Sequence, residues 1–462
     1  MKKNLLYALL LLLSACNKFP DFPEDPVKPG TDNEKPLPAQ YGTPFANVPD
    51  PRDAVIYEVN MRAFSSTGNF NGVKARLDEI KALGVNVLYL MPIHPIGVLK
   101  TVNSPYCVKN YEGINSAFGN LDDLRTLVAE AHNRDMAVIF DWVADHTAWD
   151  HPWIANKAWY KQNSAGEIIS PPNTNWTDVA QLNYGNATMR LAMIREMKYW
   201  IFNANIDGYR CDAADFVPVD FWQQANDSLN NITTHKLLLF AEGTRDDHYT
   251  AKFQMRYGME FYYTLKDDVF ANGETVKLID NLNASEYASA IPNVSQVVRY
   301  ITNHDVNLAE GVPQDFFGGI KGSIATFMVA AYMKGVPMFY NGQEVACPTK
   351  LDYFNTSTPI NWSINASTLS EYKKIMAFRK TNEALRRGTL TSYSSNDVCA
   401  FTKISGAQKV LVLVNLRNST INYSVPAALQ NTSWQDAFDN TATTVGTSVS
   451  LQPYSYLVLK VN

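Results

Sequence analysis

Two kinds of hydrophobic pattern alternate along the chain from residue 54 onward. The runs at 85–91 and 137–143 are almost wholly apolar, as is typical of strands that are buried on both faces. The stretches at 73–83 and 121–134 instead repeat apolar residues every three or four positions, which predicts helices with one apolar face. Strands that alternate with helices in this way predict a parallel sheet covered by helices.

The alternation continues to about residue 384 and predicts eight strands. These are Ala54–Val59, Val85–Met91, Ala137–Val143, Ile206–Cys211, Leu237–Ala241, Met259–Tyr263, Val297–Thr302 and Pro337–Tyr340. Eight strands separated by helices fit a (β/α)8 TIM barrel over residues 51–384. The segment 147–185 has no clear period and several tryptophans, so we interpret it as an inserted domain after strand 3.

Beyond residue 385 the helical pattern stops. Short apolar runs separated by turn residues predict a C-terminal antiparallel β-sandwich over 385–462. The expected strands are Leu390–Phe401, Val410–Asn415, Thr420–Val425 and Tyr454–Leu459.

The N-terminus has the composition of an export signal. Two lysines precede a short apolar run, and the run ends in small residues and Cys16, which predicts a signal peptide over 1–16. The ending Leu-Ser-Ala-Cys resembles a bacterial lipoprotein box, which implies lipidation of Cys16 and an anchor in the bacterial membrane, with the outer membrane favoured. An ordinary signal peptide with a chance cysteine is the alternative. The proline-rich stretch 17–50 is interpreted as a tether.

Charge and cysteine content narrow the function classes. A formal net charge of -5 over 462 residues gives no basic patch of the kind that binds nucleic acid. The remaining cysteines are widely spaced, so we expect buried free thiols, although spacing alone leaves one disulfide open. They are Cys107, Cys211, Cys347 and Cys399.

Polar residues gather at the ends of four predicted strands, where barrel enzymes place their reacting groups. The four segments are Asp141–His146, Gly208–Asp212, Glu242 with its neighbours, and Asn303–Asp305. A single aspartate at a strand end is usually a helix cap, and a single buried Arg–Asp pair is usually structural. Four such clusters in an otherwise apolar sheet would be costly to bury without a function.

Spacing adds detail to two of these clusters. Arg210 and Asp212 lie two residues apart on a strand and therefore share a face, so the arginine is expected to favour the ionised carboxylate and lower its pKa. His304 and Asp305 are adjacent, which predicts that the strand ends or bends there.

These segments resemble the four signature regions of the α-amylase family of glycoside hydrolases, in the same order and over roughly residues 50–460. The resemblance implies that Asp212 is the nucleophile, Glu242 the general acid and base, and Asp305 a transition-state stabiliser. It also implies that five further residues bind or support the substrate: Tyr106, Asp141, His146, Arg210 and His304. Such double displacement needs two carboxyl groups about 5–5.5 Å apart.

The sequence departs from the family pattern at three points. Asp145 stands where the family usually has a calcium-binding Asn, so calcium is possible with Asp145 and Asp178 as ligands, and no organic cofactor is implied. Asp215-Phe216 replaces the usual Lys-His after the nucleophile, which leaves the product pattern open. Gly243-Thr244 follows Glu242 in place of an aromatic residue.

The resemblance implies a retaining hydrolase of α-1,4-glucosidic bonds in starch-like glucans or maltooligosaccharides. Glucanotransferase, α-glucosidase or neopullulanase-type activity on the same barrel is the alternative. A non-catalytic glycan-binding lipoprotein is a further alternative, although a binding protein needs no proton donor. The sequence leaves open the linkage preference, the product length, the membrane face, the oligomeric state and any protein partners.

Overall fold

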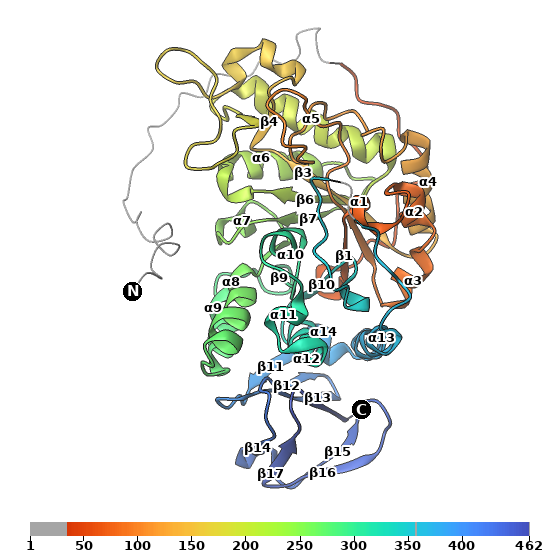
Figure 1. The fold of residues 1–462 in the computed structure, drawn as a ribbon, viewed down its shortest axis with the longest axis vertical. Coiled ribbons are helices and arrows are strands. Elements are labelled where there is room, and N and C mark those ends of the chain that lie inside the picture. The colour runs from red at the N-terminus through yellow and green to blue at the C-terminus, as the bar shows by residue number, and fades with distance from the viewer. Residues whose placement is uncertain (1–34, 356–357, 462) are drawn as a thin grey trace. The chain divides into compact units, whose positions relative to one another are not determined.

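The computed structural model describes residues 35–355 and 358–461. Within them, eight parallel strands form a closed barrel in the order β1-β10-β9-β8-β7-β6-β3-β2 (Figure 1). The fold class expected from the sequence is therefore confirmed. The barrel strands are β1 Ile56–Val59, β2 Val87–Leu90, β3 Ala137–Val143, β6 Gly208–Asp212, β7 Leu238–Ala241, β8 Met255–Tyr257, β9 Gln296–Arg299 and β10 Val336–Tyr340.

Helices follow the strands and cover the outside of the barrel (Figure 1). The α-helices are α1 Met61–Phe64, α2 Phe70–Lys74, α3 Leu77–Ala82, α4 Leu121–His132, α5 Ala187–Ala204, α6 Val219–Asn230, α7 Asp247–Thr250, α8 Met259–Tyr263, α9 Lys277–Glu286, α10 His304–Ala309, α11 Pro313–Phe316, α12 Gly319–Tyr332, α13 Ala366–Thr381 and α14 Glu383–Arg387. Short 3-10 turns are η1 Pro51–Asp53, η2 Pro152–Ala155, η3 Lys157–Trp159, η4 Ala214–Phe216, η6 Gln343–Val345 and η7 Ala427–Leu429, and η5 Thr264–Ala271 is a π-helix.

Helix α4 shows how local sequence sets an element. Asn120 caps its N-terminus by accepting from two backbone N–H groups, and the Asp123 side chain accepts from the Asn120 backbone N–H in return. The helix then buries one face, formed by Leu124, Leu127, Val128 and Ala131, at the spacing expected for a helix on a sheet. The helix therefore begins where its cap stands and packs its apolar face against the barrel.

Two sequence predictions about elements of the barrel are wrong. The sixth strand is β8, Met255–Tyr257, whereas the predicted Met259–Tyr263 forms helix α8. Four of these five residues are apolar or aromatic, a short pattern that fits either element, and here Phe261 and Tyr262 are buried while Tyr263 is exposed. The single helix predicted over 73–83 is two helices, α2 and α3, with a break between them.

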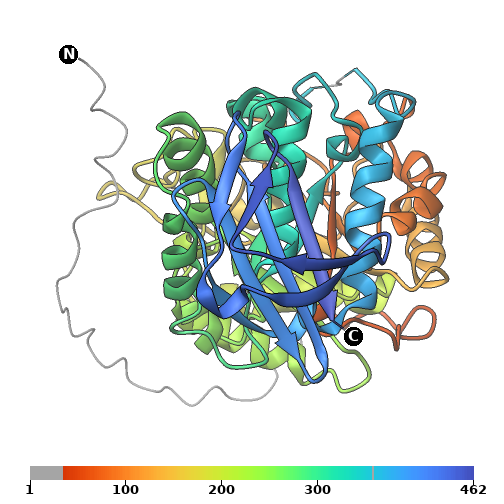
Figure 2. The same ribbon diagram turned by 90° about the horizontal axis from the view of Figure 1, so that it is seen from below.

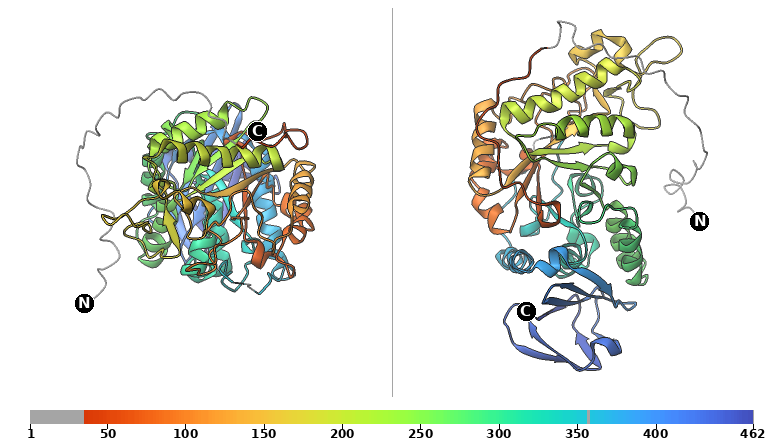
Figure 3. Two further views of the ribbon diagram at one scale, coloured as in Figure 1. Left: turned by 90° about the horizontal axis from the view of Figure 1, so that it is seen from above. Right: turned by 180° about the vertical axis from the view of Figure 1, so that it is seen from behind.

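The segment after β3 contains a small two-stranded sheet of its own. Strand β4, His146–Ala148, pairs antiparallel with β5, Val179–Gln181. In Figure 1 and in the right panel of Figure 3 this segment, in yellow, lies at the opposite end of the barrel unit from the blue C-terminal sheet. The insertion therefore lies where β3 ends, beside the polar strand ends.

The C-terminal region forms a six-stranded sheet in the order β11-β12-β13-β18-β15-β16 and a two-stranded sheet β14-β17. Seen from below, this region lies across the barrel (Figure 2). The predicted strand Leu390–Phe401 is in fact parts of two strands, β11 and β12, that pair antiparallel. The strands are β11 Thr389–Ser392, β12 Val398–Ser405, β13 Gln408–Asn415, β14 Ile421–Ser424, β15 Thr432–Asp436, β16 Ala442–Val445, β17 Ser448–Leu451 and β18 Tyr456–Val461.

A buried lysine joins this sheet to the barrel helices. Lys403 on β12 is 1% exposed, and its ammonium donates to the carbonyl oxygens of Met333, at 3.0 Å, and Leu385. Met333 caps the C-terminus of α12, and Leu385 lies in α14, so the charge meets carbonyls near the ends of two helices. Burial lowers the pKa of Lys403 well below its usual value.

Two further observations concern the described part of the chain. The four cysteines there are buried free thiols, as the sequence predicts. None of the helices there has the length and apolar character that crossing a bilayer requires.

Candidate active site

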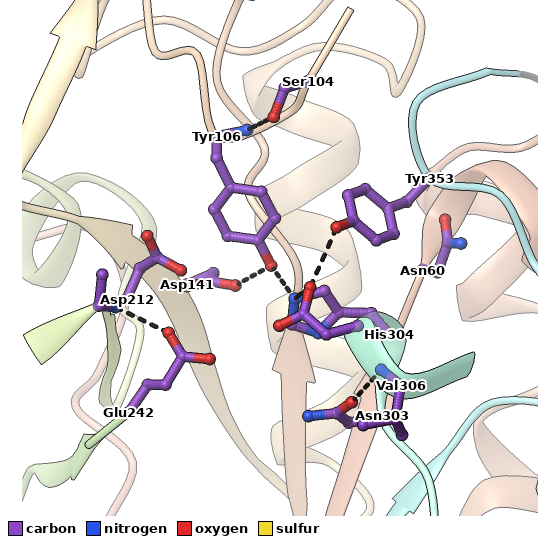
Figure 4. A network of polar contacts seen from close by, with 12 residues as sticks. Asn60, Ser104, Tyr106, Asp141, Asp212, Glu242, Asn303, His304, Val306 and Tyr353 are labelled. Carbon is purple, nitrogen blue, oxygen red and sulfur yellow. Dashed lines mark hydrogen bonds and ion pairs between the residues drawn. The ribbon is translucent and has the colours of Figure 1, made fainter. Parts of the chain in front are cut away.

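The four predicted polar clusters converge at one end of the barrel. Asp141 lies in β3, Arg210 and Asp212 lie in β6, and Glu242 directly follows β7. His304 and Asp305 begin α10, and the Asn303 side chain caps this helix by accepting from the Val306 N–H at 2.9 Å. Strand β9 ends at Arg299, so the chain does leave the strand before His304, as predicted. Figure 4 shows the side chains from these segments facing one another.

Arg210 holds three carboxylates together beneath this site. The side chain is fully buried, and its Nη1 donates to Asp141 at 2.6 Å and to Asp212 at 2.8 Å. Its Nη2 lies 2.5 Å from Oε1 of Glu242. One cation therefore faces three carboxyl groups, so Arg210 alone cannot neutralise all of them.

The balance of charge corrects one expectation. Burial raises the pKa of Asp212 well above its usual value, and the neighbouring Glu242 and Asp141 raise it further. Arg210 does lower this pKa, as the sequence predicts, but its effect is outweighed. Burial also raises the pKa of Glu242. Because like charges this close resist full ionisation, the pair Asp212 and Glu242 is expected to share a proton.

Glu242 is fixed by the backbone that follows the nucleophile candidate. The Ala213 N–H donates to Oε2 of Glu242 at 2.7 Å. Ala213 has a φ of 44°, in the left-handed region that non-glycine residues seldom adopt. This strained turn aims the backbone N–H at the carboxyl group, so β6 positions both members of the pair.

Tyr106 connects the aspartate of β3 to the histidine of α10. Its hydroxyl donates to Asp141 at 3.0 Å and lies 2.7 Å from Nε2 of His304, as Figure 4 shows. Tyr89 also donates to Asp141, at 2.6 Å. The rings of Tyr106 and His304 are stacked with centroids 5.5 Å apart, so one wall of the site is a continuous hydrogen-bonded surface.

Asp305 is the most exposed of the three predicted catalytic carboxylates. Its side chain is 49% exposed, and Oδ1 accepts a hydrogen bond from the Tyr353 hydroxyl at 3.0 Å. The same oxygen lies 3.3 Å from Nε2 of His304. Asp305 can therefore contact a molecule entering the cavity.

A cavity of about 580 Å³ opens between these groups. The three predicted catalytic carboxylates line it together with Tyr106, His146 and His304. Asp141 and Arg210 lie behind this lining. The structure thus brings together all eight residues predicted to act on substrate, and their individual roles stay predictions.

Aromatic side chains form the far wall of the cavity. Trp176 from the inserted segment and Phe216 from η4 have ring centroids 5.5 Å apart, and Trp176 also contacts the ring of His146. Phe216 is 50% exposed. An exposed aromatic plane beside buried carboxylates suits the C–H faces of a sugar ring.

Asp215 belongs to a compact polar group next to this wall. Its Oδ1 lies 2.6 Å from Nε2 of His248, and its Oδ2 accepts from the Thr244 N–H at 2.9 Å. A Cβ at Gly243 would come within 2.4 Å of Asp215 and 2.5 Å of His248. The glycine after Glu242 is therefore required by this pair of side chains.

The two predicted metal ligands do not form an acidic cluster. Both are buried, but only Asp178 lines the cavity. The carboxylate of Asp145 faces two nitrogens, His146 Nδ1 at 3.3 Å and Gln181 Nε2 at 3.5 Å. Among the described residues there is no group of three or more His, Cys, Asp and Glu side chains placed to hold a metal. Cys16 lies outside the described residues.

Two residues of the site were missed by sequence reasoning. Glu58 on β1 is fully buried, and its Oε1 lies 2.5 Å from Nδ1 of His304. An acidic residue within the apolar run 54–59 is a signal that could have identified it. Tyr353 follows β10 in a loop without periodic pattern, so nothing in the sequence marks it.

Comparisons with known proteins identify the family of the chain. The family model described as the alpha amylase catalytic domain matches residues 42–173 and 173–359. Alpha-amylase 2 of Dictyoglomus thermophilum is 27% identical over 430 residues, covering 86% of this chain and 71% of the relative. A cyclomaltodextrin glucanotransferase of Paenibacillus macerans is 23% identical, covering 78% of this chain and 56% of that protein.

A solved structure shows the same fold. The alpha-amylase from Lactobacillus plantarum superposes with a TM-score of 0.78 at 26% identity, covering 89% of this chain and 99% of that chain. The family match spans more than half of the chain, and the matched residues include every carboxylate of the cavity described above. The chain therefore belongs to the α-amylase family of retaining glycoside hydrolases.

Proposed function

We propose that this protein hydrolyses α-1,4-glucosidic bonds in starch-like glucans or maltooligosaccharides, with retention of configuration. Asp212 attacks the anomeric carbon and forms a β-linked glycosyl ester, while Glu242 protonates the departing oxygen. Glu242 then deprotonates the water that releases the sugar with its α configuration. Asp305 binds sugar hydroxyls and stabilises the cationic transition state.

One observation carries this proposal: Asp212 and Glu242 face the same cavity, bridged by a single buried arginine. The raised pKa of Glu242 suits a group that must donate a proton near neutral pH. The hydrogen bond from Arg210 to Asp212 favours the charge on the nucleophile when the shared proton resides on Glu242.

A product profile tests the proposal. The purified protein is incubated with soluble starch, maltotriose, pullulan and cyclodextrins, reducing ends are measured, and the first-formed anomer is followed by proton NMR. We expect starch and maltooligosaccharides to be cleaved with α-anomeric products. Release of β-anomers, or activity confined to α-1,6 bonds, would contradict the proposal.

Transfer to a sugar acceptor is the second candidate activity, and the aromatic wall favours it. Phe216 is half exposed beside the leaving-group side, where an apolar plane can hold a sugar acceptor and keep water away from the intermediate. Glucanotransferase, α-glucosidase and neopullulanase-type activities share the same carboxylates. Longer products formed from maltotriose would identify transfer.

We further propose that the protein is exported and anchored to the bacterial membrane, with the outer membrane favoured, through a lipid on Cys16. The support is the sequence alone: a basic start, a short apolar run and a cysteine at the cleavage position. A lipidated cysteine followed by a proline-rich tether would hold the barrel close to an extracytoplasmic glucan supply.

Fractionation tests the anchor. The Cys16→Ser variant is expected to move from the membrane fraction to the soluble fraction with its specific activity unchanged. If the variant and the unaltered protein are bound to the membrane in equal amounts, the proposal of a lipid anchor on Cys16 is wrong.

Calcium at Asp145 and Asp178 is proposed from the family resemblance alone. An ion bound to Asp145 would have to displace the nitrogens of His146 and Gln181 that now face its carboxylate. If calcium binds, chelation lowers the melting temperature more than the room-temperature activity, because the ion stabilises only the folded state. An unchanged melting temperature, with no metal in the purified protein, would contradict the proposal of a calcium site.

A further inference from the structure

Glu58 is a buried carboxylate that the proposed reaction does not use. It lies on β1, next to Tyr89 of β2 and Tyr340 of β10 in the barrel register, and it is fully buried. Its Oε1 contacts Nδ1 of His304 at 2.5 Å, while its Oε2 has no hydrogen-bond partner among the described residues. A buried, half-satisfied carboxylate is costly, so its place beside His304 calls for an explanation.

His304 is enclosed by charged and titratable groups from several elements. Glu58 approaches Nδ1, whereas Asp305 and the Tyr106 hydroxyl approach Nε2 at 3.3 and 2.7 Å. The groups that face the ring or act on its charge are Glu58 from β1, Tyr106 from the loop after β2, Arg210 from β6, Asp305 from α10 and Tyr353 from the loop after β10. Two carboxylates therefore flank opposite nitrogens of one ring.

This arrangement favours a doubly protonated ring. With Glu58 ionised, Nδ1 must carry the proton between them, and a neutral ring would then present an Nε2 lone pair to the Asp305 carboxylate 3.3 Å away. An imidazolium presents an N–H there instead. Burial works against the charge, but Asp305 and Glu58 outweigh it and raise the pKa of His304 to about 9.

We propose that Glu58 is a positioning residue that keeps His304 as an imidazolium, so that its Nε2–H, which faces the Tyr106 hydroxyl and Asp305, presents positive charge to the sugar bound beside them. The sugar in this statement rests on the proposed function. Glu58 acts through His304, since it is separated from the cavity by the ring that it holds. The imidazolium of His304 is then a second cation, besides Arg210, in a site that contains several carboxylates.

The Glu58→Gln variant tests the proposal because the amide keeps the size and one acceptor oxygen of Glu58 but lacks its charge. Removal of an opposite charge at this distance is expected to lower the pKa of His304 by about one unit or more. The alkaline limb of kcat/KM should move to lower pH by a similar amount. Activity near pH 6 should change much less than activity near pH 8.

The direct readout is an NMR titration of the His304 ring in the full chain. The chain has 7 histidines, and comparison with a His304→Gln variant identifies the signal. This titration requires no substrate, so it remains informative even if the proposed substrate is wrong. In the unaltered protein we expect His304 to titrate near 9, and a value near 6.5 would overturn the proposal without any variant.

Asp207 provides a matched control, because it is also a buried carboxylate paired with a histidine. Its Oδ2 lies 2.8 Å from Nε2 of His132, at the opposite ends of the strands. Asp207→Asn should lower the melting temperature but leave the alkaline limb in place.

Glu58→Asp keeps the charge and should restore at least part of the alkaline limb that Glu58→Gln loses.

Two results would overturn the proposal. One is a pKa of His304 that is the same in Glu58→Gln and in the unaltered protein. The other is a Glu58→Gln variant that loses stability but keeps the original pH profile, since Glu58 would then be structural only. If Glu58→Gln does not fold, the titration of the unaltered protein and the Glu58→Asp profile still decide the question.

Discussion

Two histidine–carboxylate pairs lie at opposite ends of the same barrel. At the end where β3 and β6 begin, Asp207 contacts His132 of α4 and accepts the Val138 N–H at 2.7 Å. Neither side chain has a buried polar atom without a partner among the described residues. This pair joins a helix to two strands, and its environment contains little else that is charged.

The pair at the other end, Glu58 and His304, has the same chemistry in a different setting. It lies among Asp305, Asp141 and Arg210, and Oε2 of Glu58 and Nε of Arg210 lack hydrogen-bond partners in the described part of the chain. Buried polar groups in proteins are normally satisfied. By this comparison the crowded, unsatisfied pair is the candidate for a functional role, whereas the isolated, satisfied pair has the features of a structural one.

The largest expected effect comes from the carboxylates at the crowded end. Asp212→Asn and Glu242→Gln should each lower turnover by at least about a thousandfold while leaving the melting temperature within a few degrees, since general acid help alone contributes roughly 10²–10⁴-fold. Steady-state kinetics and thermal unfolding measure the two quantities. Substantial activity in Asp212→Asn would remove the nucleophile assignment.

A substrate with a good leaving group separates the two roles. With it, Glu242→Gln should form the glycosyl-enzyme and then stall, because hydrolysis needs the same residue as a base. Asp212→Asn should form no intermediate, as mass spectrometry of the intact protein can show. Azide added to Glu242→Ala should give an α-configured glycosyl azide.

The next largest effect is expected at the other end, where Gly208 follows Asp207. Gly208 has a φ of 141°, and an added Cβ would come within 1.9 Å of the Leu238 carbonyl oxygen. Gly208→Ala should therefore lower the free energy of unfolding by about 3 kcal/mol or more. Denaturant unfolding measures it, and Gly446→Ala, whose Cβ meets nothing within 4 Å, is the control.

Glu344 is a buried carboxyl outside the cavity lining, so it tests whether burial alone, without a role in the cavity, changes stability with pH. Burial raises its pKa from 4.5 to about 7. Between pH 4.5 and 7 the folded protein therefore holds a proton that the unfolded chain has lost. The contribution of this proton to the free energy of unfolding is full below pH 4.5 and is lost as the pH rises through 7. Across that range, Glu344→Gln should gain up to about 3 kcal/mol relative to the unaltered protein.

Unfolding measured at pH 4.5 and pH 7.5 tests this prediction. The kinetic pH profile of Glu344→Gln should match that of the unaltered protein, since Glu344 contacts Tyr57 and Gly342 instead of the cavity groups. A difference in unfolding free energy that is the same at both pH values would show that folding does not raise the pKa of Glu344.

The smallest effect is expected at the aromatic wall. Phe216→Ala should change the ratio of transfer to hydrolysis by about two- to tenfold, because an aromatic contact contributes about 0.5–1.5 kcal/mol. Product analysis with maltotriose gives the ratio. Phe354→Ala, which also alters the cavity lining, shows whether any loss of aromatic surface has the same effect.

The sequence predicted most of the barrel because its strands are long apolar runs. It misplaced the sixth strand because Met255–Tyr257 has only three residues and includes the buried Arg256, whereas the nearby helix α8 is more apolar. Four strand-end clusters were predictable from side-chain chemistry and spacing. Glu58 was marked only as an acidic residue in an apolar run; its contact with His304 could not be predicted, because the two lie 246 positions apart and only the closed barrel brings them together.

Lys403 has a consequence for exchanging parts between related enzymes. Among the described residues, those that line the cavity all precede residue 384, yet Lys403 of the terminal sheet satisfies carbonyls near the ends of two barrel helices. A chimera that receives a foreign terminal module without an equivalent cation would leave those carbonyls facing a dry interface. The barrel and its terminal sheet should therefore be exchanged together, because one side chain links them.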